Sequence, residues 1–360
     1  MPTPPQTIEQ PKQASSSWRK FLIKLKSWEY WPFNLFYAPI YFYWAWLMLK
    51  ARSILFFTAS NPGIENGGFL FESKHTIFKG IPNQWLPATF LVQPGQAQTT
   101  IDALLAQQKI SYPFIAKPDR GERGWMVEKI DTPAQLQQYL EVIQVPFLVQ
   151  EYVDMPIEMG VFWYRYPNQQ QGQVSSVVIK ALLTVTGNGT STLEQLVLAN
   201  DRAYLQYEAL QARWASQWHQ VVPKGQALLL MPIGNHCRGT AFLNGEGVIN
   251  SQLHAVFNHI SNHIEGFYYG RYDIRCSSID DLHAGKNIRI LELNGCGAEP
   301  GHIYQPGYSI FKAYRVLLAH YRAMYKISVM NHQNGTPYMT FKQGLAVRQQ
   351  MRQYNKANKR

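Results

Sequence analysis

The sequence predicts an α+β protein built from two α/β lobes with antiparallel sheets. Apolar runs of strand length alternate with amphipathic stretches of helix length from residue 53 onward. Several strand-like runs follow one another across short turns, which favours antiparallel pairing and a layered architecture with a cleft. With 360 residues, 46% of them hydrophobic, the chain is long enough to bury the cores of two or three domains.

The beginning of the chain differs in composition from the rest. Residues 1–17 are rich in Pro, Gln and Ser, and we expect a disordered tail there. Residues 18–52 begin with a basic amphipathic helix of the kind that lies in a membrane interface. Its apolar residues recur at helical spacing: Trp18, Phe21, Leu22 and Leu25.

An uncharged aromatic segment follows this helix. Residues 32–49 contain no charged side chain and are just long enough to span a bilayer. Pro39 and the many Tyr and Trp residues fit the headgroup level better than the hydrocarbon centre. A membrane span, an interfacial contact and ordinary packing, including an oligomer interface, are therefore the three alternatives.

The net charge of +11 is concentrated at the two ends of the chain. Residues 1–60 hold seven basic and two acidic residues, and residues 341–360 hold six basic residues and no acidic one. Basic ends suit an anionic surface, although solvated tails would have the same composition. The aromatic segment carries almost no interleaved charge, so a specific nucleic-acid partner is not expected.

Strands and helices are predicted in order from periodicity and from the turn residues between them. Runs rich in β-branched and aromatic residues are typical of strands: 53–58, 89–92, 113–118, 146–153, 158–167, 175–185, 269–276 and 287–294. Stretches with apolar residues three and four apart are typical of helices: 99–110, 132–143, 190–214, 252–267 and 309–327. Thr132 is the expected N-cap of its helix, and residues 226–250 are β-like.

One lysine closes an apolar run, where a charged side chain is unusual. Lys117 lies in the predicted strand 113–118, and because lysine is seldom fully buried, we expect an anion to face it. Gly121 and Gly124 follow in a loop whose backbone N–H groups could cradle phosphate oxygens. The spacing excludes a GxxxxGK[ST] loop, and a surface turn with an exposed lysine is the alternative.

Two glutamates surround the turn between the next two predicted strands. Glu151 and Glu158 lie seven residues apart in the segment VQEYVDMPIEMGVF. An apolar slot with carboxylates at its rim would suit an adenosine, with one carboxylate binding the ribose hydroxyls. The alternative is a pair of surface glutamates on a hairpin.

The densest group of polar residues lies on two later strands. Alternation places Arg271, Asp273 and Arg275 on one face of the first strand. Glu292 and Asn294 likewise share one face of the second strand. Carboxylate and amide oxygens are hard ligands of the kind that hold Mg²⁺ at nucleotide phosphates, although a solvated sheet face is also possible.

In order and spacing these three groups resemble the ATP-grasp superfamily, in particular carboxylate–amine ligases such as D-alanine–D-alanine ligase. FIAKPDRGERG is similar to the strand and glycine loop of the family, VQEYVDMPIE to its nucleotide hinge, and GRYDIRC with LELNGCGAEPGH to its metal-binding strands. VVIKALLTVTGNGTSTLEQLVLAND is similar to a segment of cyanophycin synthetase and bifunctional glutathione synthetase. The resemblance covers about residues 110–310 and implies an ATP-grasp fold, with two antiparallel sheets enclosing the nucleotide.

The resemblance also implies roles for individual residues. The nucleotide would be bound by Lys117, Arg120, Gly121, Gly124, Glu151, Glu158 and Lys180. One or two Mg²⁺ ions, or Mn²⁺, would be held by Asp273, Glu292 and Asn294. Arg271 and Lys180 would be catalytic, with Arg271 steadying the developing oxyanion, and Arg238 and Gly295 would contact substrate.

The predicted domains follow from these assignments. After the segment 18–52 we expect a short N-terminal α/β domain at 53–110 and an ATP-grasp domain at 111–330. Within that domain the smaller lobe is expected at about 111–180 and the larger lobe at about 181–330. A basic tail, residues 331–360, completes the chain.

The implied activity is that of an ATP-dependent ligase of the EC 6.3 kind, which joins a carboxylate to an amine or similar nucleophile through an acylphosphate. The sequence departs from the family in two places. The loop between the metal-binding strands is longer than usual, and NGCGAEPGH replaces a Pro-Gly ending, which leaves the acceptor substrate undefined. A phosphotransferase and a membrane-associated nucleotide-binding protein with a decayed site are the alternatives.

The expected partners are small carboxylate and amine substrates, together with an anionic membrane surface contacted by the basic ends. The sequence leaves homo-oligomer formation open. Cys237, Cys276 and Cys296 form no CxxC pair, which favours a reducing compartment. The chain shows no apolar signal segment at its beginning, so we expect a cytoplasmic protein, either free or peripheral on the inner face of the membrane.

Overall fold

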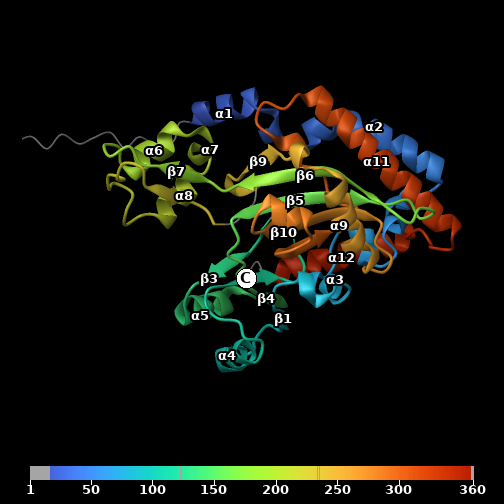
Figure 1. The fold of residues 1–360 in the computed structure, drawn as a ribbon, viewed down its shortest axis with the longest axis horizontal. Coiled ribbons are helices and arrows are strands. Elements are labelled where there is room, and N and C mark those ends of the chain that lie inside the picture. Colours follow the sequence, from blue (N-terminus) through green and yellow to red (C-terminus); the bar gives the residue numbers. More distant parts are fainter. Residues whose placement is uncertain (1–16, 122–123, 233, 235, 358–360) are drawn as a thin grey trace, which may run out of the picture. The chain divides into compact units, whose positions relative to one another are not determined.

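The computed structural model describes residues 17–121, 124–232, 234 and 236–357, which group into two compact units. The smaller unit joins Met1–Phe36 with Leu183–Met231, and the main unit joins Tyr37–Leu182 with Pro232–Arg360. Figure 1 shows the elements of each unit, coloured along the sequence. Nearly all of the predicted disordered tail, residues 1–17, lies outside the described residues.

Two antiparallel sheets form the centre of the main unit, which confirms the predicted α+β class. The first sheet has the order β1-β4-β2-β3: Thr89–Val92, Phe147–Glu151, Phe114–Pro118 and Glu128–Ile130. The second sheet has the order β11-β10-β5-β6-β9: Ile288–Asn294, Tyr269–Cys276, Ile157–Tyr164, Gln173–Ala181 and Ala241–Asn244. The predicted strand pairs β5–β6 and β10–β11 are antiparallel neighbours.

The chain passes from the first sheet to the second between β4 and β5. Strands β5 and β6 pair with each other, and β5 also pairs with β10. The predicted smaller lobe, residues 111–180, therefore contains strands of both sheets. Local periodicity identifies each strand but does not reveal which distant strand it joins.

Helices of the main unit flank the two sheets (Figure 1). They are α2 (Phe33–Ala51, beginning in the smaller unit), α3 (Lys74–Lys79), α4 (Gln98–Gln107), α5 (Pro133–Val142), α9 (Ser251–Asn262), α10 (Ile279–His283), α11 (Ile310–Gln333) and α12 (Phe341–Ala357). Short 3₁₀ turns are η2 (Phe56–Ser60), η3 (Glu65–Gly68), η4 (Asn83–Trp85), η5 (His236–Arg238), η6 (Glu246–Val248) and η7 (Gly301–Tyr304). Thr132 caps α5 as predicted, because its hydroxyl accepts a hydrogen bond from Gln135 N at 3.3 Å.

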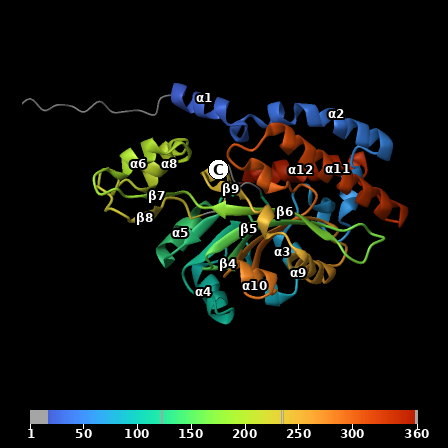
Figure 2. The ribbon, with the colours of Figure 1, turned by 45° about the horizontal axis from the view of Figure 1, so that its top comes forward.

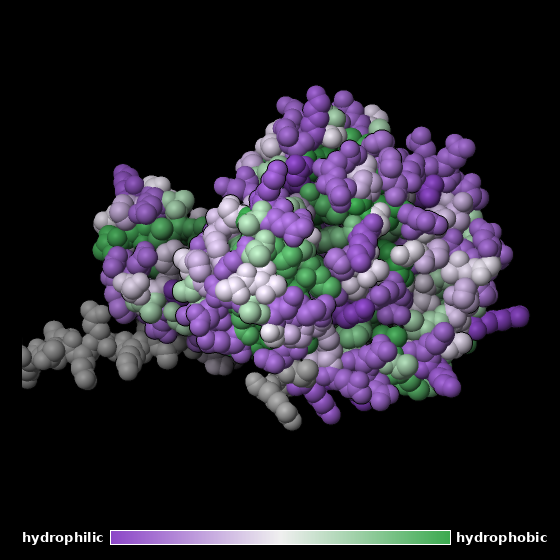
Figure 3. Space-filling view, turned by 90° about the horizontal axis from the view of Figure 1, so that it is seen from below, coloured by the Kyte–Doolittle hydropathy of each residue, from purple (hydrophilic) through white to green (hydrophobic). Residues whose placement is uncertain are grey.

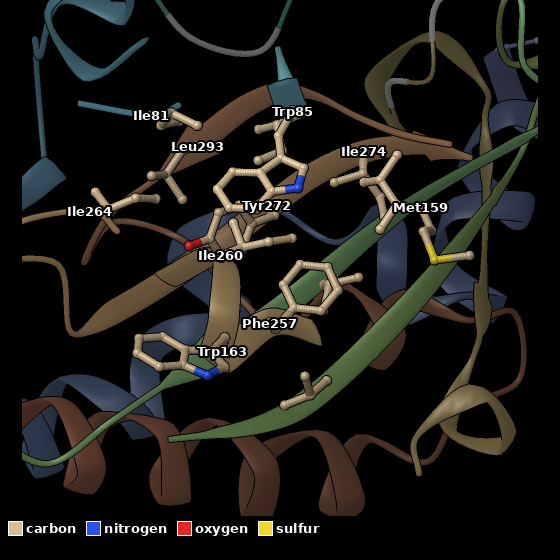
Figure 4. Packing of buried hydrophobic residues seen from close by; sticks show 14 of the residues in the cluster. Ile81, Trp85, Met159, Trp163, Phe257, Ile260, Ile264, Tyr272, Ile274 and Leu293 are labelled. Atoms are coloured by element: carbon tan, nitrogen blue, oxygen red, sulfur yellow. The ribbon is translucent and has the colours of Figure 1, made fainter. Parts of the chain in front are cut away.

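The second sheet is covered on both faces, which explains why β5 is apolar along nearly its whole length. On one face Trp163 packs toward α9, and its indole N–H donates to Asn258 Oδ1 at 3.1 Å. Figure 4 shows this core, in which Phe257 of α9 meets Tyr272 of β10 with ring centroids 5.3 Å apart. On the opposite face Phe162 packs with residues of α11. Alternation along β5 thus joins two cores.

The first sheet has a core of its own. Phe114, Phe147 and Val149 are fully buried there with residues of α4 and α5. Figure 3 shows a view from below the orientation of Figure 1, in which hydrophilic residues predominate and apolar patches lie among them. Such a mixture is ordinary for a protein surface.

Helix α2 packs against α11, and the two lie side by side in Figures 1 and 2. Trp44 of α2 meets Tyr321 of α11 edge-on at 5.1 Å, and Leu47 is buried in the same core. Among the described residues, none of the helices combines the length and the apolar character needed to cross a membrane. The aromatic segment 32–49 is thus a helix with one packed side.

The smaller unit combines helices with a two-stranded sheet. Its elements are α1 (Ser17–Lys26), η1 (Trp28–Tyr30), β7 (Thr184–Thr186), α6 (Leu193–Ala199), α7 (Asp201–Tyr204), α8 (Tyr207–Arg213) and β8 (Ala227–Leu229). Arg19 of α1 pairs with Asp201 at 3.0 Å, and Lys20 pairs with Glu208 at 2.7 Å. The predicted amphipathic helix is present as α1, with Ile23 as its buried residue.

Two predictions of secondary structure were wrong. Residues 53–58 do not form a strand, since they lead into η2. Thr58 and Ser60 donate their hydroxyls to the carbonyls of Leu55 and Phe57, each at 2.7 Å, and so favour helical turns. The long helix predicted at 190–214 is three helices, because the Asn200 side chain caps α7 by accepting from Arg202 N and Ala203 N.

The β-like region and the basic tail also differ in detail from expectation. The described residues of 226–250 contain only two short strands, β8 and β9, which belong to different sheets. Residues 331–360 include the end of α11 and all of α12, so the predicted tail is largely helical.

Candidate active site

Lys117 of β2 is buried in the main unit, with 7% of its surface exposed. Its Nζ donates to Gln150 Oε1 at 3.0 Å and to the Leu291 carbonyl at 2.8 Å. No described carboxylate lies within ion-pair distance of it. Burial lowers the pKa of Lys117 to about 8, although Glu292 acts in the opposite direction. The predicted lysine is thus a buried cation with neutral hydrogen-bond partners.

A second lysine lies in an ionic cluster on the other sheet. Lys180 of β6 contacts Glu158 Oε1 at 3.2 Å and Asp273 Oδ1 at 3.3 Å. Burial opposes the charge of Lys180, but the two carboxylates outweigh burial and raise its pKa. Arg275 completes the cluster, since its Nη2 donates to Glu158 Oε2 at 2.9 Å. Glu158, one of the residues expected to bind the nucleotide, therefore lies in this site between two cations.

Asp273 and Arg271 occupy one face of β10, as alternation predicts. Arg271 donates from Nε and Nη2 to the two Asp273 oxygens at 3.2 and 3.1 Å. Asn294 Nδ2 donates to Asp273 Oδ2 at 3.2 Å. Burial would raise the pKa of Asp273, but the charges of Arg271 and Lys180 hold it below its usual range. Arg271 Nη1 also reaches the Glu299 carbonyl at 3.2 Å.

The close packing of these side chains requires a glycine opposite them. Gly160 of β5 pairs with Asp273 in the strand register. A Cβ at this position would lie 3.1 Å from Arg271 Cδ, 3.2 Å from Asp273 Oδ1 and 2.9 Å from Val178 Cγ1. Only a residue without a side chain leaves this space to the ion pair.

Glu292 of β11 lies beside the cluster and is more exposed. It is the register partner of Asp273. About a third of its side chain is exposed, at 33%, and its carboxylate is 3.7 Å from Lys74 Nζ. Lys74 also donates to the Gly121 carbonyl at 2.7 Å. A lysine from the predicted N-terminal domain thus connects the glycine loop with the predicted metal ligand.

The glycine loop has the backbone conformation that its composition suggests. Gly121 and Gly124 have φ of 144° and 72°, values that side-chain-bearing residues rarely adopt. Arg238, predicted to meet substrate, donates to the Gly124 carbonyl at 2.9 Å. Arg120, predicted to bind phosphate, pairs instead with Glu65 at 2.8 Å and lies over the Phe71 ring at 4.9 Å.

Two predicted residues lie apart from the ionic cluster. Glu151 is exposed, accepts a hydrogen bond from Ala88 N at 3.1 Å, and borders a depression of about 430 Å³ with Lys109 and Asp154. Gly295 packs against backbone, because a Cβ there would lie 2.5 Å from the Gly67 carbonyl oxygen. That position is explained by packing of the 295–297 loop on η3, where Cys296 N and Gly297 N donate to the Gly67 and Gly68 carbonyls.

Several residues of the site were missed or left undecided by sequence reasoning. Gln150 is buried on β4 beside Lys117, where alternation along the strand could have identified it. Glu299 accepts hydrogen bonds from the hydroxyls of Tyr37 and Tyr304, the latter at 2.5 Å. Glu299 lies in an irregular loop and Tyr37 is more than 250 residues away in sequence, so no periodic signal connects them.

The ionic cluster carries more buried positive than negative charge. Its buried or half-buried cations are Lys117, Lys180, Arg271 and Arg275. Its buried or half-buried carboxylates are Asp273, Glu158 and Glu299, one fewer than the cations. Because isolated buried charge is unfavourable, this excess favours the binding of an anion. The rim pair Lys74–Glu292 adds one charge of each sign and leaves the excess unchanged.

The oxygen atoms of Asp273, Glu292 and Asn294 are chemically suited to bind a hard cation. In the described part of the chain, no group of three or more His, Cys, Asp or Glu side chains could hold a metal ion. Asp273 and Glu292 supply two carboxylates, and Asn294 adds an amide that already contacts Asp273. Mg²⁺ is commonly held by one or two carboxylates together with substrate phosphates, so the set fits that mode of binding.

Comparison with known proteins gives similarity at the level of solved structures. No family model and no curated protein matches the chain. Similar structures include a bifunctional glutathione synthetase from Pasteurella multocida (13% identity, 68% of this chain and 36% of that chain, TM-score 0.37). They also include a D-alanine–D-alanine ligase from Bacillus anthracis (12% identity, 72% of this chain and 67% of that chain, TM-score 0.39). A third is the VanG D-Ala:D-Ser ligase from Enterococcus faecalis (13% identity, 70% of this chain and 61% of that chain, TM-score 0.41).

D-alanine–D-alanine ligase and bifunctional glutathione synthetase are also proteins whose motifs the sequence resembles. The chain is similar in structure to both, at TM-scores of 0.37 and 0.39. It spans 36% of the glutathione synthetase and 61% of the D-Ala:D-Ser ligase.

Proposed function

We propose that the main unit binds ATP at the ionic cluster and uses it to join a carboxylate to an amine or similar nucleophile. The observation that carries the proposal is Lys117, a buried cation with neutral partners, in an ionic cluster whose buried or half-buried cations outnumber its carboxylates by one. Triphosphate oxygens would offset this excess. The products of the reaction would be the ligated molecule, ADP and phosphate.

Several groups are arranged to receive the phosphates. Lys117 approaches from the first sheet and Lys180 from the second, and the backbone near Gly121 and Gly124 offers a turn between charged side chains. Arg120 would join them only if its pair with Glu65 opened. We assign Glu151 to the nucleoside side of the site, from the depression at the end of β4. Glu158 would join it only if a contact with Lys180 or Arg275 opened.

Asp273, Glu292 and Asn294 would hold one or two Mg²⁺ ions, and Mn²⁺ would fit the same oxygens. The ion would neutralise charge on the phosphates during transfer. Arg271 and Lys180 contact the oxygens of Asp273 at 3.1–3.3 Å. These two cations therefore keep Asp273 ionised and in position.

The proposed chemistry has two steps. A substrate carboxylate oxygen attacks the terminal phosphorus of ATP, the bond to the ADP oxygen breaks, and an acylphosphate forms. An amine then attacks the acyl carbon, and phosphate leaves with the bonding electron pair. Arg271, fixed by Asp273 and by the Glu299 carbonyl, would stabilise the tetrahedral oxyanion. Arg238 is assigned to a substrate carboxylate near the glycine loop.

Nucleotide affinity is expected to fall as the pH rises above about 8. The free protein holds Lys117 with a pKa of about 8, and an anion bound opposite would raise that pKa. Above pH 8 binding must therefore take up a proton, and affinity falls by up to about tenfold per pH unit. Calorimetric titration with ADP between pH 7 and 9.5 measures the slope. A variant lacking the amine, Lys117→Met, should lose this slope, and an identical slope in both proteins contradicts the assignment.

The activity is tested by ADP release from Mg·ATP in the presence of pooled amino acids and small carboxylates. Substrate-dependent ADP release with stoichiometric phosphate and a condensed product supports the ligase. ADP release with a phosphorylated product and no condensation would replace it with a phosphotransferase on the same site. If the protein neither releases ADP nor is stabilised by nucleotide, both enzyme hypotheses are contradicted. A binding protein with a decayed site then remains.

A further inference from the structure

One side of α2 is apolar and exposed along the part of the helix that belongs to the main unit. Phe42 and Leu49 are 81% and 78% exposed, and Trp46 between them is 49% exposed. The exposed positions repeat every three to four residues and define the α2 apolar stripe: Ala38, Pro39, Phe42, Ala45, Trp46 and Leu49. Because the opposite side of α2 is buried on α11, this stripe is the outer surface of the helix.

The neighbouring helix α11 exposes cations instead. Its exposed basic residues recur at helical spacing and define the α11 basic stripe: Lys312, Arg315, Arg322 and Lys326. None of the four forms an ion pair with a described carboxylate, and neither α2 nor α11 contains an acidic residue. Phe311, at the beginning of α11, is 80% exposed beside them.

Contacts between the helices connect the two stripes. Lys50 Nζ lies 4.5 Å from the Trp46 ring of α2 and 5.7 Å from the Tyr325 ring of α11. The charge of Arg322 acts on Tyr43 of α2, opposing the rise in its pKa that burial causes. Figures 1 and 2 show the helices side by side over much of their length. The apolar stripe and the basic stripe therefore adjoin each other on one surface.

We propose that this surface, formed by α2 and α11, binds an anionic phospholipid bilayer at its interface. Exposed Phe and Leu would enter the boundary of the acyl chains, Trp46 would lie at the headgroup level, and the basic stripe would meet anionic headgroups. A second copy of the chain fits less well, because a symmetric contact would bring the unpaired cations of both copies together. Neither α2 nor α11 contains an acidic residue, which likewise disfavours a basic or neutral protein partner.

The test is co-sedimentation of the full chain with vesicles of phosphatidylcholine alone and of phosphatidylcholine with 30% phosphatidylserine. We expect binding to the anionic vesicles that is at least about tenfold tighter than to the neutral ones and weaker at high salt. Replacing the four cations of the basic stripe with Gln should reduce anionic binding at least about tenfold. Phe42→Ser with Leu49→Ser should reduce it similarly, because the apolar contribution is lost.

A matched control removes four exposed cations elsewhere: Lys79, Arg213, Lys224 and Lys286, each to Gln. This variant has the same net charge as the basic-stripe variant, and we expect its binding to stay within about twofold of wild type. An equal loss of vesicle binding in both variants would mean that binding depends only on net charge, and it would overturn the proposal. Binding that survives the basic-stripe and Phe42/Leu49 changes, or a concentration-dependent dimer abolished by Phe42→Ser with Leu49→Ser, would overturn it as well.

Discussion

Replacing Glu292 with Gln is expected to lower substrate-dependent ADP release by roughly 100-fold or more, the scale of losing one charged group at a phosphoryl-transfer site. Glu292 faces Asp273 across the strand pair and completes the proposed metal-binding oxygens. The fold should survive, because the carboxylate is one-third exposed and its one described ion pair is 3.7 Å long. Chemical denaturation should show a change in unfolding free energy within about 0.5 kcal/mol.

The control for this variant is Glu141→Gln, which changes an exposed glutamate near the end of α5. It should keep full activity and stability. If Glu292→Gln turned over at the wild-type rate in Mg·ATP, the assignment of Glu292 as a metal ligand would be wrong.

Replacing Lys117 with Met is expected to weaken ADP binding by at least about 30-fold. Removing one partner of a buried charge contact commonly costs about 2 kcal/mol or more, which corresponds to this factor. Stability should change by no more than about 1 kcal/mol, because Met fills the space and the cost of burying an amine disappears, while Gln150 loses its donor. Isothermal titration calorimetry and urea denaturation measure the two quantities on the same preparation.

Lys79→Met serves as the comparison, since Lys79 is an exposed lysine at the end of α3. Unchanged affinity in Lys117→Met, or a large loss of stability with proportionate loss of binding, would contradict the role of Lys117 as a phosphate contact. The first outcome would place the nucleotide elsewhere, and the second would make the residue structural.

Much of the site could be predicted because it lies on regular strands. Alternation alone places Arg271, Asp273 and Arg275 on one face, and the structure brings them into one ionic cluster with Lys180. The antiparallel pairing of β10 with β11 then adds Glu292 opposite Asp273. A period of two residues is a local property, and it survives whatever the rest of the chain does.

Interactions between distant segments could not be predicted in this way. Arg120 pairs with Glu65, and Glu158 pairs with Arg275, over separations of 55 and 117 residues. Nothing in the local pattern of Arg120 distinguishes a phosphate contact from an ion pair. The failure at residues 53–58 has a similar origin, since a short apolar run suits a strand or a buried turn equally well.

Gly160 gives a practical way to recognise relatives of this chain. Its missing side chain leaves room for Arg271, Asp273 and Val178, and a larger residue would crowd all three. We therefore expect homologues with a working site to keep glycine at this place in the strand, two positions after the equivalent of Glu158. Homologues that carry valine or a larger residue there should also have altered a residue equivalent to Val178, Arg271 or Asp273. The residue at the position of Gly160 in a homologous sequence would thus indicate, before any assay, whether that protein has kept the chemistry.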